Sequence, residues 1–270
     1  MSDTPQVSLG DACATLLLIP DPIAKARGVA RLSRRVRNGR WRPGSASAGD
    51  RPARPPQPVL LSPREMPKRK IGSPRGRAAL LHALAHIELN AVDLALDIVV
   101  RFGGETGPLA AGDRLAFCQD WLGVARDEAK HFLLLSRRMR QLDVAYGDFP
   151  AHDGLWTAAE KTSHDLLARL AIVPLVHEAR GLDVQPIMID RLKGAGDAAS
   201  ADVLAIIARD EVNHVRIGYS WFTRLCALNG VEPNDRYRAL VAQYHGSAAR
   251  GEFNTDARMR AGLPQSFYQF

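Results

Sequence analysis

Two short stretches of the sequence nearly repeat each other: RDEAKHF at residues 126–132 and RDEVNHV at residues 209–215. Each contains the pattern Glu-x-x-His. On a helix, residues three apart differ by about 300° in azimuth and by one turn in height, so the two side chains project side by side and can grip one ion. One such pair is weak evidence, because Glu and His at this spacing are common on solvated helix faces. Two pairs with the same Arg-Asp prefix are a much stronger indication of metal ligands.

Two further glutamates lie in strongly apolar surroundings. Glu88 is part of HALAHIELNAVDLALD, and Glu178 follows closely on the run LAIVPLV. A carboxylate on a helix that is apolar over most of its circumference needs a compensating partner. The order along the chain is Glu, Glu-x-x-His, Glu, Glu-x-x-His, which is the ligand inventory of ferritin-like di-iron and di-manganese carboxylate bundles. We therefore predict six metal ligands: Glu88, Glu128, His131, Glu178, Glu211 and His214.

The charges and spacings of these residues agree with a dinuclear site. Four ionised glutamates are balanced by two divalent cations. Without metal, the clustered carboxylates would have to take up protons or would repel one another. Carboxylate with imidazole suits iron or manganese, while zinc more often takes His and Cys in four-coordinate sites. We expect two iron ions, with manganese or a mixed iron/manganese pair as alternatives. The intervals 88–128 and 178–211 each allow a helical hairpin that brings mid-helix residues level.

Small residues stand where a further histidine would complete the pattern. Ala91 and Gly181 come three residues after the lone glutamates. Open coordination positions are what dioxygen or peroxide would need. The alternative is that small residues simply let helices approach closely. His86 lies about 200° from Glu88 on the helix and is expected to be a satisfied interior or interface histidine instead of a ligand.

Helical periodicity dominates the chain after residue 76. It predicts long helices at 76–102, 113–143, 155–182 and 198–229 and a further helix at 234–249. Alternating strand signals are nearly absent. The predicted fold is all-α, a ferritin-like antiparallel four-helix bundle (residues 76–270) with an extra C-terminal helix, preceded by a basic, Pro-rich arm (residues 1–75) that contains one or two short helices before residue 38.

The net charge of +7 is concentrated in the arm. Residues 1–77 hold 16 Lys or Arg against 5 Asp or Glu, and the rest of the chain holds 20 against 24. A basic arm can touch nucleic acid, and it can equally be a solvated wrapper around the bundle. The three scattered cysteines indicate neither a zinc ribbon nor a disulfide scaffold, and the apolar run near the start is too short for export or for spanning a bilayer. We expect a cytoplasmic protein with no membrane partner.

Several stretches resemble one family over almost the whole chain: HALAHIELNAVDLALD, DEAKHF, YGDFPAHDGLW, EARGLDVQP and DEVNHVRIG. They are similar to a bacterial ferritin-like family catalogued only as a domain of unknown function. More distantly the chain resembles ferritin-like tRNA hydroxylases, rubrerythrins and di-iron oxygenases, which share the ligand inventory and not the loops. The resemblance implies a fold and a metal site, and it supplies no reaction.

The resemblance also implies supporting residues. In related oxygenases the Asp before each Glu-x-x-His glutamate holds the opposite histidine, so Asp127 would hold His214 and Asp210 would hold His131. The alternative is that each Asp pairs with the adjacent Arg or with solvent.

The leading functional interpretation is a di-iron oxidoreductase that activates dioxygen or peroxide, with an electron donor, to oxidise an unidentified small-molecule or RNA substrate. The alternatives are an iron-handling or peroxide-scavenging protein without an organic substrate, and a nucleic-acid-associated, tRNA-modifying protein. The sequence does not decide whether the protein forms a homodimer.

Overall fold

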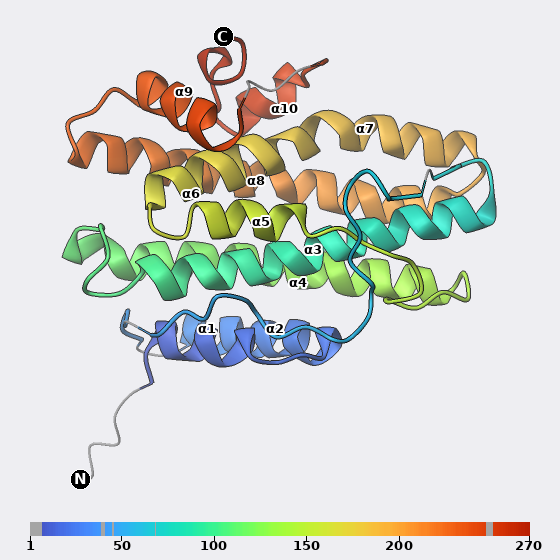
Figure 1. Cartoon of the computed structure of the whole chain (residues 1–270), viewed down its shortest axis with the longest axis horizontal. Helices are drawn as coiled ribbons and strands as arrows, with labels where there is room; N and C mark the ends of the chain where they lie inside the picture. The colour runs from blue at the N-terminus through green and yellow to red at the C-terminus, as the bar shows by residue number, and fades with distance from the viewer. Residues whose placement is uncertain (1–6, 39–40, 45, 68, 247–250) are drawn as a thin grey trace. The chain divides into compact units, whose positions relative to one another are not determined.

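The computed structural model describes residues 7–38, 41–44, 46–67, 69–246 and 251–270. The regular elements of this part of the chain are all helices, which confirms the all-α prediction (Figure 1). The α-helices are α1 (Leu9–Leu17), α2 (Pro22–Asn38), α3 (Pro74–Phe102), α4 (Arg114–Arg140), α5 (Gly154–Lys161), α6 (Leu166–Ile172), α7 (Ala179–Gly194), α8 (Ala198–Leu228), α9 (Pro233–Tyr244) and α10 (Thr255–Arg260). The shorter turns are η1 (Ala111–Asp113), the π-helical η2 (Val173–Glu178) and η3 (Gln265–Phe267). Among these helices, none is long and apolar enough to cross a bilayer.

The chain forms two compact units. The first contains residues 1–66 and 82–152, and the second contains residues 67–81 and 153–270. The last part of α3 and all of α4 thus belong to the first unit, and α5 to α10 belong to the second. The boundary predicted between the arm and the bundle at residues 75 and 76 stays a prediction.

Polar caps start the helices that the periodicity predicted. The hydroxyl of Ser73 accepts the backbone N–H of Gly76 at the start of α3, directly before Pro74. The carboxylate of Asp197 accepts the N–H of Ser200 at the start of α8. Such a side chain satisfies one of the orphan N–H groups of the first turn, and Pro at the first helical position loses no hydrogen bond. These two helices begin within two residues of the predicted positions.

The N-terminal helices α1 and α2 belong to the first unit. Helix α2 packs along α4 and also contacts α1 (Figure 1). The buried ammonium of Lys25 on α2 lies 2.6 Å from Asp93 Oδ1 on α3, and Arg54 Nε lies 3.1 Å from Asp93 Oδ2. A buried carboxylate held by two cations fixes the arm in one register, since losing either cation would remove a charge-assisted contact to Asp93 in the interior.

The third predicted helix, 155–182, is wrong as a single element. Helix α5 ends at Lys161, and α6 starts after Asp165, whose carboxylate accepts the N–H of Ala168. The buried Arg169 closes the break by donating Nε–H to Thr162 Oγ1 at 2.9 Å and an Nη2–H to the carbonyl of Ala159 at 2.7 Å. The apolar periodicity is continuous through this segment, so it predicted one helix. Periodicity alone does not detect a capping residue such as Asp165 within the apolar face.

The connection predicted from residue 182 is also helical, because α7 runs to Gly194 with Pro186 inside it. Proline normally breaks a helix, but the loss of one hydrogen bond is tolerated where packing holds both sides. Upstream, Pro174 lies in the π-helical turn η2, where Ala179 N–H reaches back five residues to the Pro174 carbonyl. A π turn absorbs one extra residue, and such turns are frequent at functional sites.

A glycine on α8 makes room for this turn. A Cβ atom built on Gly218 would lie 2.5 Å from Pro174 Cβ and 2.6 Å from its Cγ. The backbones of α8 and η2 therefore approach more closely than any other residue at position 218 would allow. Tertiary packing of the second unit thus sets the conformation of the segment that ends in Glu178.

Candidate metal centre

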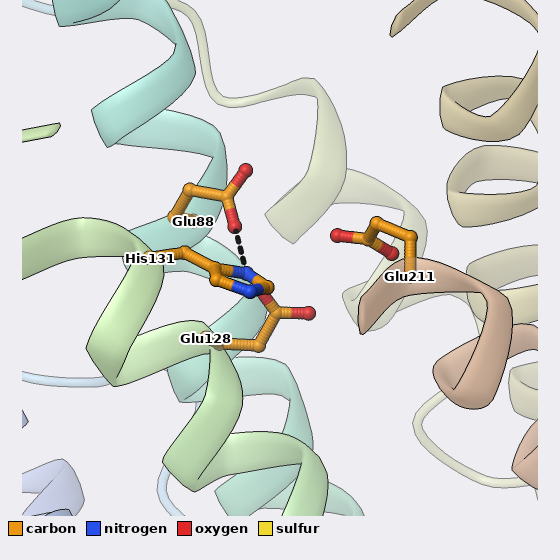
Figure 2. Close-up of side chains that lie close together, drawn as sticks. All are labelled: Glu88, Glu128, His131 and Glu211. Carbon is orange, nitrogen blue, oxygen red and sulfur yellow. Dashed lines mark hydrogen bonds and ion pairs between the residues drawn. The ribbon is translucent and has the colours of Figure 1, made fainter. Parts of the chain in front are cut away.

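Three of the predicted ligands come together in the first unit. Glu88 projects from α3, and Glu128 and His131 project from α4 (Figure 2). One donor atom of each lies within 4.8 Å of the others. His131 Nδ1 lies 3.0 Å from Glu88 Oε2 and 3.3 Å from Glu128 Oε2, and the His131 side chain is fully buried. We call these residues the first donor set.

Burial makes the charges of this set interdependent. Burial, followed by the negative charge of Glu128, raises the pKa of the Glu88 carboxyl well above its ordinary value. Burial alone would lower the pKa of the His131 imidazole, but hydrogen bonds and charge from Glu128 and Glu88 raise it to about 11. The metal-free cluster therefore retains protons, and a bound cation would supply positive charge in their place.

The other three predicted ligands, Glu178, Glu211 and His214, lie in the second unit, and we call them the second donor set. His214 Nδ1 and Glu211 Oε2 on α8 are 3.4 Å apart, and both residues are buried, with His214 fully so. Figure 2 labels Glu211 on its helix. Glu178 is the last residue of the π-helical turn η2 and is half-buried, in contrast to Glu88, which is 3% exposed. The Glu-x-x-His pair is therefore side by side in both units, as the helical spacing predicted.

The two aspartates before the Glu-x-x-His pairs contact their own neighbours. Asp127 Oδ1 accepts from Arg126 Nη2 at 3.0 Å, with Lys130 Nζ 3.7 Å away. Asp210 Oδ1 accepts from Arg209 Nε at 3.0 Å. These are the contacts expected if each Asp pairs with the adjacent Arg instead of with a histidine. The role of Asp127 and Asp210 as supports of the opposite histidines stays a prediction.

The small residues beside the lone glutamates differ in their surroundings. Ala91 is buried on α3. A Cβ on Gly181 of α7 would meet only Gln185 Nε2, at 3.7 Å, which is ordinary van der Waals contact. Close helix packing therefore gives no reason for glycine at position 181. Gln185 itself is 7% exposed, and its Oε1 accepts no hydrogen bond from any described residue.

The polar support around the first donor set was not foreseen from the sequence. Tyr146, in the connection after α4, hydrogen-bonds His86 Nδ1 at 2.8 Å and stacks on His82. The Gly147 N–H donates to His82 Nε2 at 2.9 Å. Burial, helped by the nearby charge of Arg54, lowers the pKa of His86 to about 3, so this histidine is neutral. His86 is thus an interior residue, but only partly satisfied, because its Nε2 is buried with no hydrogen-bond partner among the described residues. Only the aromatic content of YGDFP hinted that the connection packs inward.

The chemistry of the first donor set fits a metal ion. It offers carboxylate oxygens and an imidazole nitrogen in an interior from which water is largely excluded, a set typical of iron, manganese and related ions. The all-helical fold and this buried Glu/His cluster define a helical protein with a candidate metal site.

The chain belongs to the family described as "Protein of unknown function (DUF455)", whose model matches residues 18–269. It is 43% identical over 211 residues to an uncharacterised protein of Haemophilus influenzae, an alignment that covers 78% of this chain and 73% of that protein. No solved structure matches the chain.

Proposed function

We propose that this protein is a ferritin-like dinuclear metal protein, with iron as its metal, that activates dioxygen or peroxide to oxidise a substrate. In this proposal α3, α4, α8 and the helical run through η2 and α7 form an antiparallel four-helix bundle, and the two donor sets face a common pair of ions. The observation that carries the proposal is the equivalence of the two sets: each unit supplies one Glu and one Glu-x-x-His pair from adjacent helical segments.

The composition of the two donor sets also supports two divalent ions per chain. Two divalent cations would balance four carboxylates, and the histidines would act as neutral ligands. Loading would then displace the proton that keeps His131 positively charged, so binding should release protons and weaken as the pH falls. The bound ions would supply Lewis acidity and a change of redox state, while the protein fixes geometry and limits access to water.

The side near Glu178 is the proposed route to the ions. Glu178 is half-buried, Gly181 has an unobstructed Cβ position, and Gln185 on the same helix has an amide oxygen that accepts no hydrogen bond from the described residues. A small polar molecule held there would satisfy this oxygen. We assign Gln185 the role of orienting the oxidant or substrate. Ala91 would leave the corresponding space beside Glu88.

The first experiment measures the metal content and optical spectrum of protein purified without added metal, before and after reduction and exposure to dioxygen or peroxide. We expect about two iron ions per chain and a spectral change stoichiometric with them. Replacing Glu128 by Ala should remove most of the metal, while His86→Ala, on the same helix as Glu88, should retain it. A full metal complement in Glu128→Ala contradicts the site.

The second experiment tests the route. Gly181→Leu should slow the reaction of the reduced protein with dioxygen at unchanged metal content, because the ligands are untouched and only the approach is obstructed. Gly123→Leu, on α4 where a Cβ would meet nothing within 4 Å, is the matched control. Uptake of ferrous ion far beyond two per chain would favour iron handling, and an inert reduced site would leave the metals with a structural role.

A further inference from the structure

Helix α2 carries a continuous row of arginines on one face. At 100° per residue these side chains fall within an arc of about 160°. Each of the five is exposed. We call them the arginine stripe: Arg27, Arg31, Arg34, Arg35 and Arg37.

The opposite face of α2 is buried and anchored. Its apolar residues are Ala26, Val29, Leu32 and Val36, all at most 7% exposed, and the helix packs along α4. Lys25 points the same way and ends in the buried ion pair with Asp93. The backbone that carries the stripe is therefore held by the core of the first unit. A rigid support lowers the entropy cost of binding a ligand with several side chains at once.

The stripe concentrates positive charge on the surface of α2. Among the described residues, no carboxylate lies within ion-pair distance of any of its five guanidinium groups. Lys25 on the same helix differs from the stripe, because its buried ammonium is paired with the carboxylate of Asp93. Five adjacent guanidinium groups repel one another. An anionic ligand bound along the stripe would relieve this repulsion and be attracted to all five groups.

An aromatic side chain lies at the end of the stripe. Trp41 donates its indole Nε1–H to the carbonyl of Arg35 at 3.3 Å and is half-buried. The other three tryptophans, Trp121, Trp156 and Trp221, are buried. An indole beside guanidiniums offers a stacking surface to an unpaired base, and arginines bind phosphates in a bidentate manner.

We propose that the arginine stripe and Trp41 form a binding surface for single-stranded nucleic acid. Phosphates would lie along α2 over about 15 Å, the rise between Arg27 and Arg37, and a base would stack on Trp41. A membrane surface fits less well, because the apolar face that would have to enter the lipid is buried against the protein. The inference does not depend on the metal, and it stands if the proposed function fails.

The test measures binding of a fluorescein-labelled 20-nucleotide oligouridylate to the full-length protein as a function of salt. If all five arginines contact phosphates, log K should fall with log salt with a slope of about −3.5. Arg27→Glu with Arg31→Glu should weaken binding at least about tenfold at low salt and flatten the slope by about 1.4. Both residues lie in the first two thirds of α2 and are exposed, so folding should be preserved, as circular dichroism would verify.

The matched control is Arg191→Glu with Arg260→Glu, which changes the net charge equally on exposed positions of the second unit. It should keep the wild-type affinity and slope. Equal loss in both double variants would overturn the assignment, since the attraction would then follow net charge alone. A slope near zero in the wild type would overturn it as well.

Tryptophan fluorescence tests the stacking. The oligouridylate should quench wild-type emission, and Trp41→Phe should abolish most of the quenching while leaving the salt slope unchanged, because Phe can stack and the arginines remain. Binding to phosphatidylserine vesicles that matches or exceeds binding to the oligonucleotide, or tighter binding to a duplex of equal length, would overturn the proposal.

Discussion

The two donor sets contain the same residue types and are held in different ways. In the first unit, side-chain bonds between elements fix the positions: His131 bridges Glu88 and Glu128, Lys25 pairs with Asp93, and Tyr146 holds His86. In the second unit, backbone geometry has this role, because Glu178 ends a π-helical turn that fits against Gly218. A repeated ligand pattern therefore does not imply a repeated support.

The difference also concerns access. Glu88 is 3% exposed, whereas Glu178 is half-buried and followed by a glycine with an open Cβ position. A closed cluster suits permanent retention of an ion, and a less enclosed one suits exchange of a ligand. Under the proposed function, the first set would anchor the metal and the second would meet the reactant.

The largest expected effect is on metal content, and it distinguishes the two sets. Glu178→Ala should leave about one ion per chain, because the three donors of the first set remain together. Glu88→Ala should lose more, since His131 would keep only one carboxylate partner. Metal analysis after exhaustive dialysis measures both. Equal retention in the two variants would break the proposed asymmetry.

The next effect is on the polar support of the first unit. Lys25→Met should lower the free energy of unfolding by about 3 kcal/mol, because Asp93 stays buried with one cation missing. Lys130→Met, which loses a half-exposed contact of 3.7 Å to Asp127, should cost less than about 1 kcal/mol. Urea unfolding compares them. Similar losses would mean that the arm is not anchored through the buried pair.

A pH-dependent effect should follow from His86. Its pKa is about 3 in the folded chain and 6.5 ordinarily, so between these values the unfolded chain binds more protons. The contribution of His86 is full above pH 6.5 and is lost as the pH falls, by about 3 kcal/mol at pH 4. In metal-free protein, His86→Gln should reduce the loss of stability between pH 7 and pH 4 by this order.

The smallest effect concerns the close approach in the second unit. Gly218→Ala should destabilise the protein by about 1–3 kcal/mol, because the new methyl group would overlap Pro174. Gly123→Ala on α4 meets nothing within 4 Å and should stabilise by up to about 1 kcal/mol through helix propensity. Thermal unfolding of both variants measures the difference. A neutral Gly218→Ala would show that the π turn relaxes freely.

Local periodicity was sufficient for much of the fold. The apolar spacing of α3, α4 and α8 is a short-range property, and it predicted these helices within a few residues. The same helical geometry predicted that Glu128 would lie beside His131 and that Glu211 would lie beside His214. The azimuth of His86 relative to Glu88 predicted that His86 would face away from the ligands.

Tertiary structure decided what depends on residues far apart in sequence. The break before α6 depends on Arg169 reaching Thr162, and the π turn depends on Gly218 leaving room for Pro174. The contact of Glu88 with His131 and the ion pair of Lys25 with Asp93 join segments separated by 43 and 68 residues. A one-dimensional pattern records which residues share a helix face. Which faces meet, and which buried charges find partners, is decided by packing and desolvation in the folded chain.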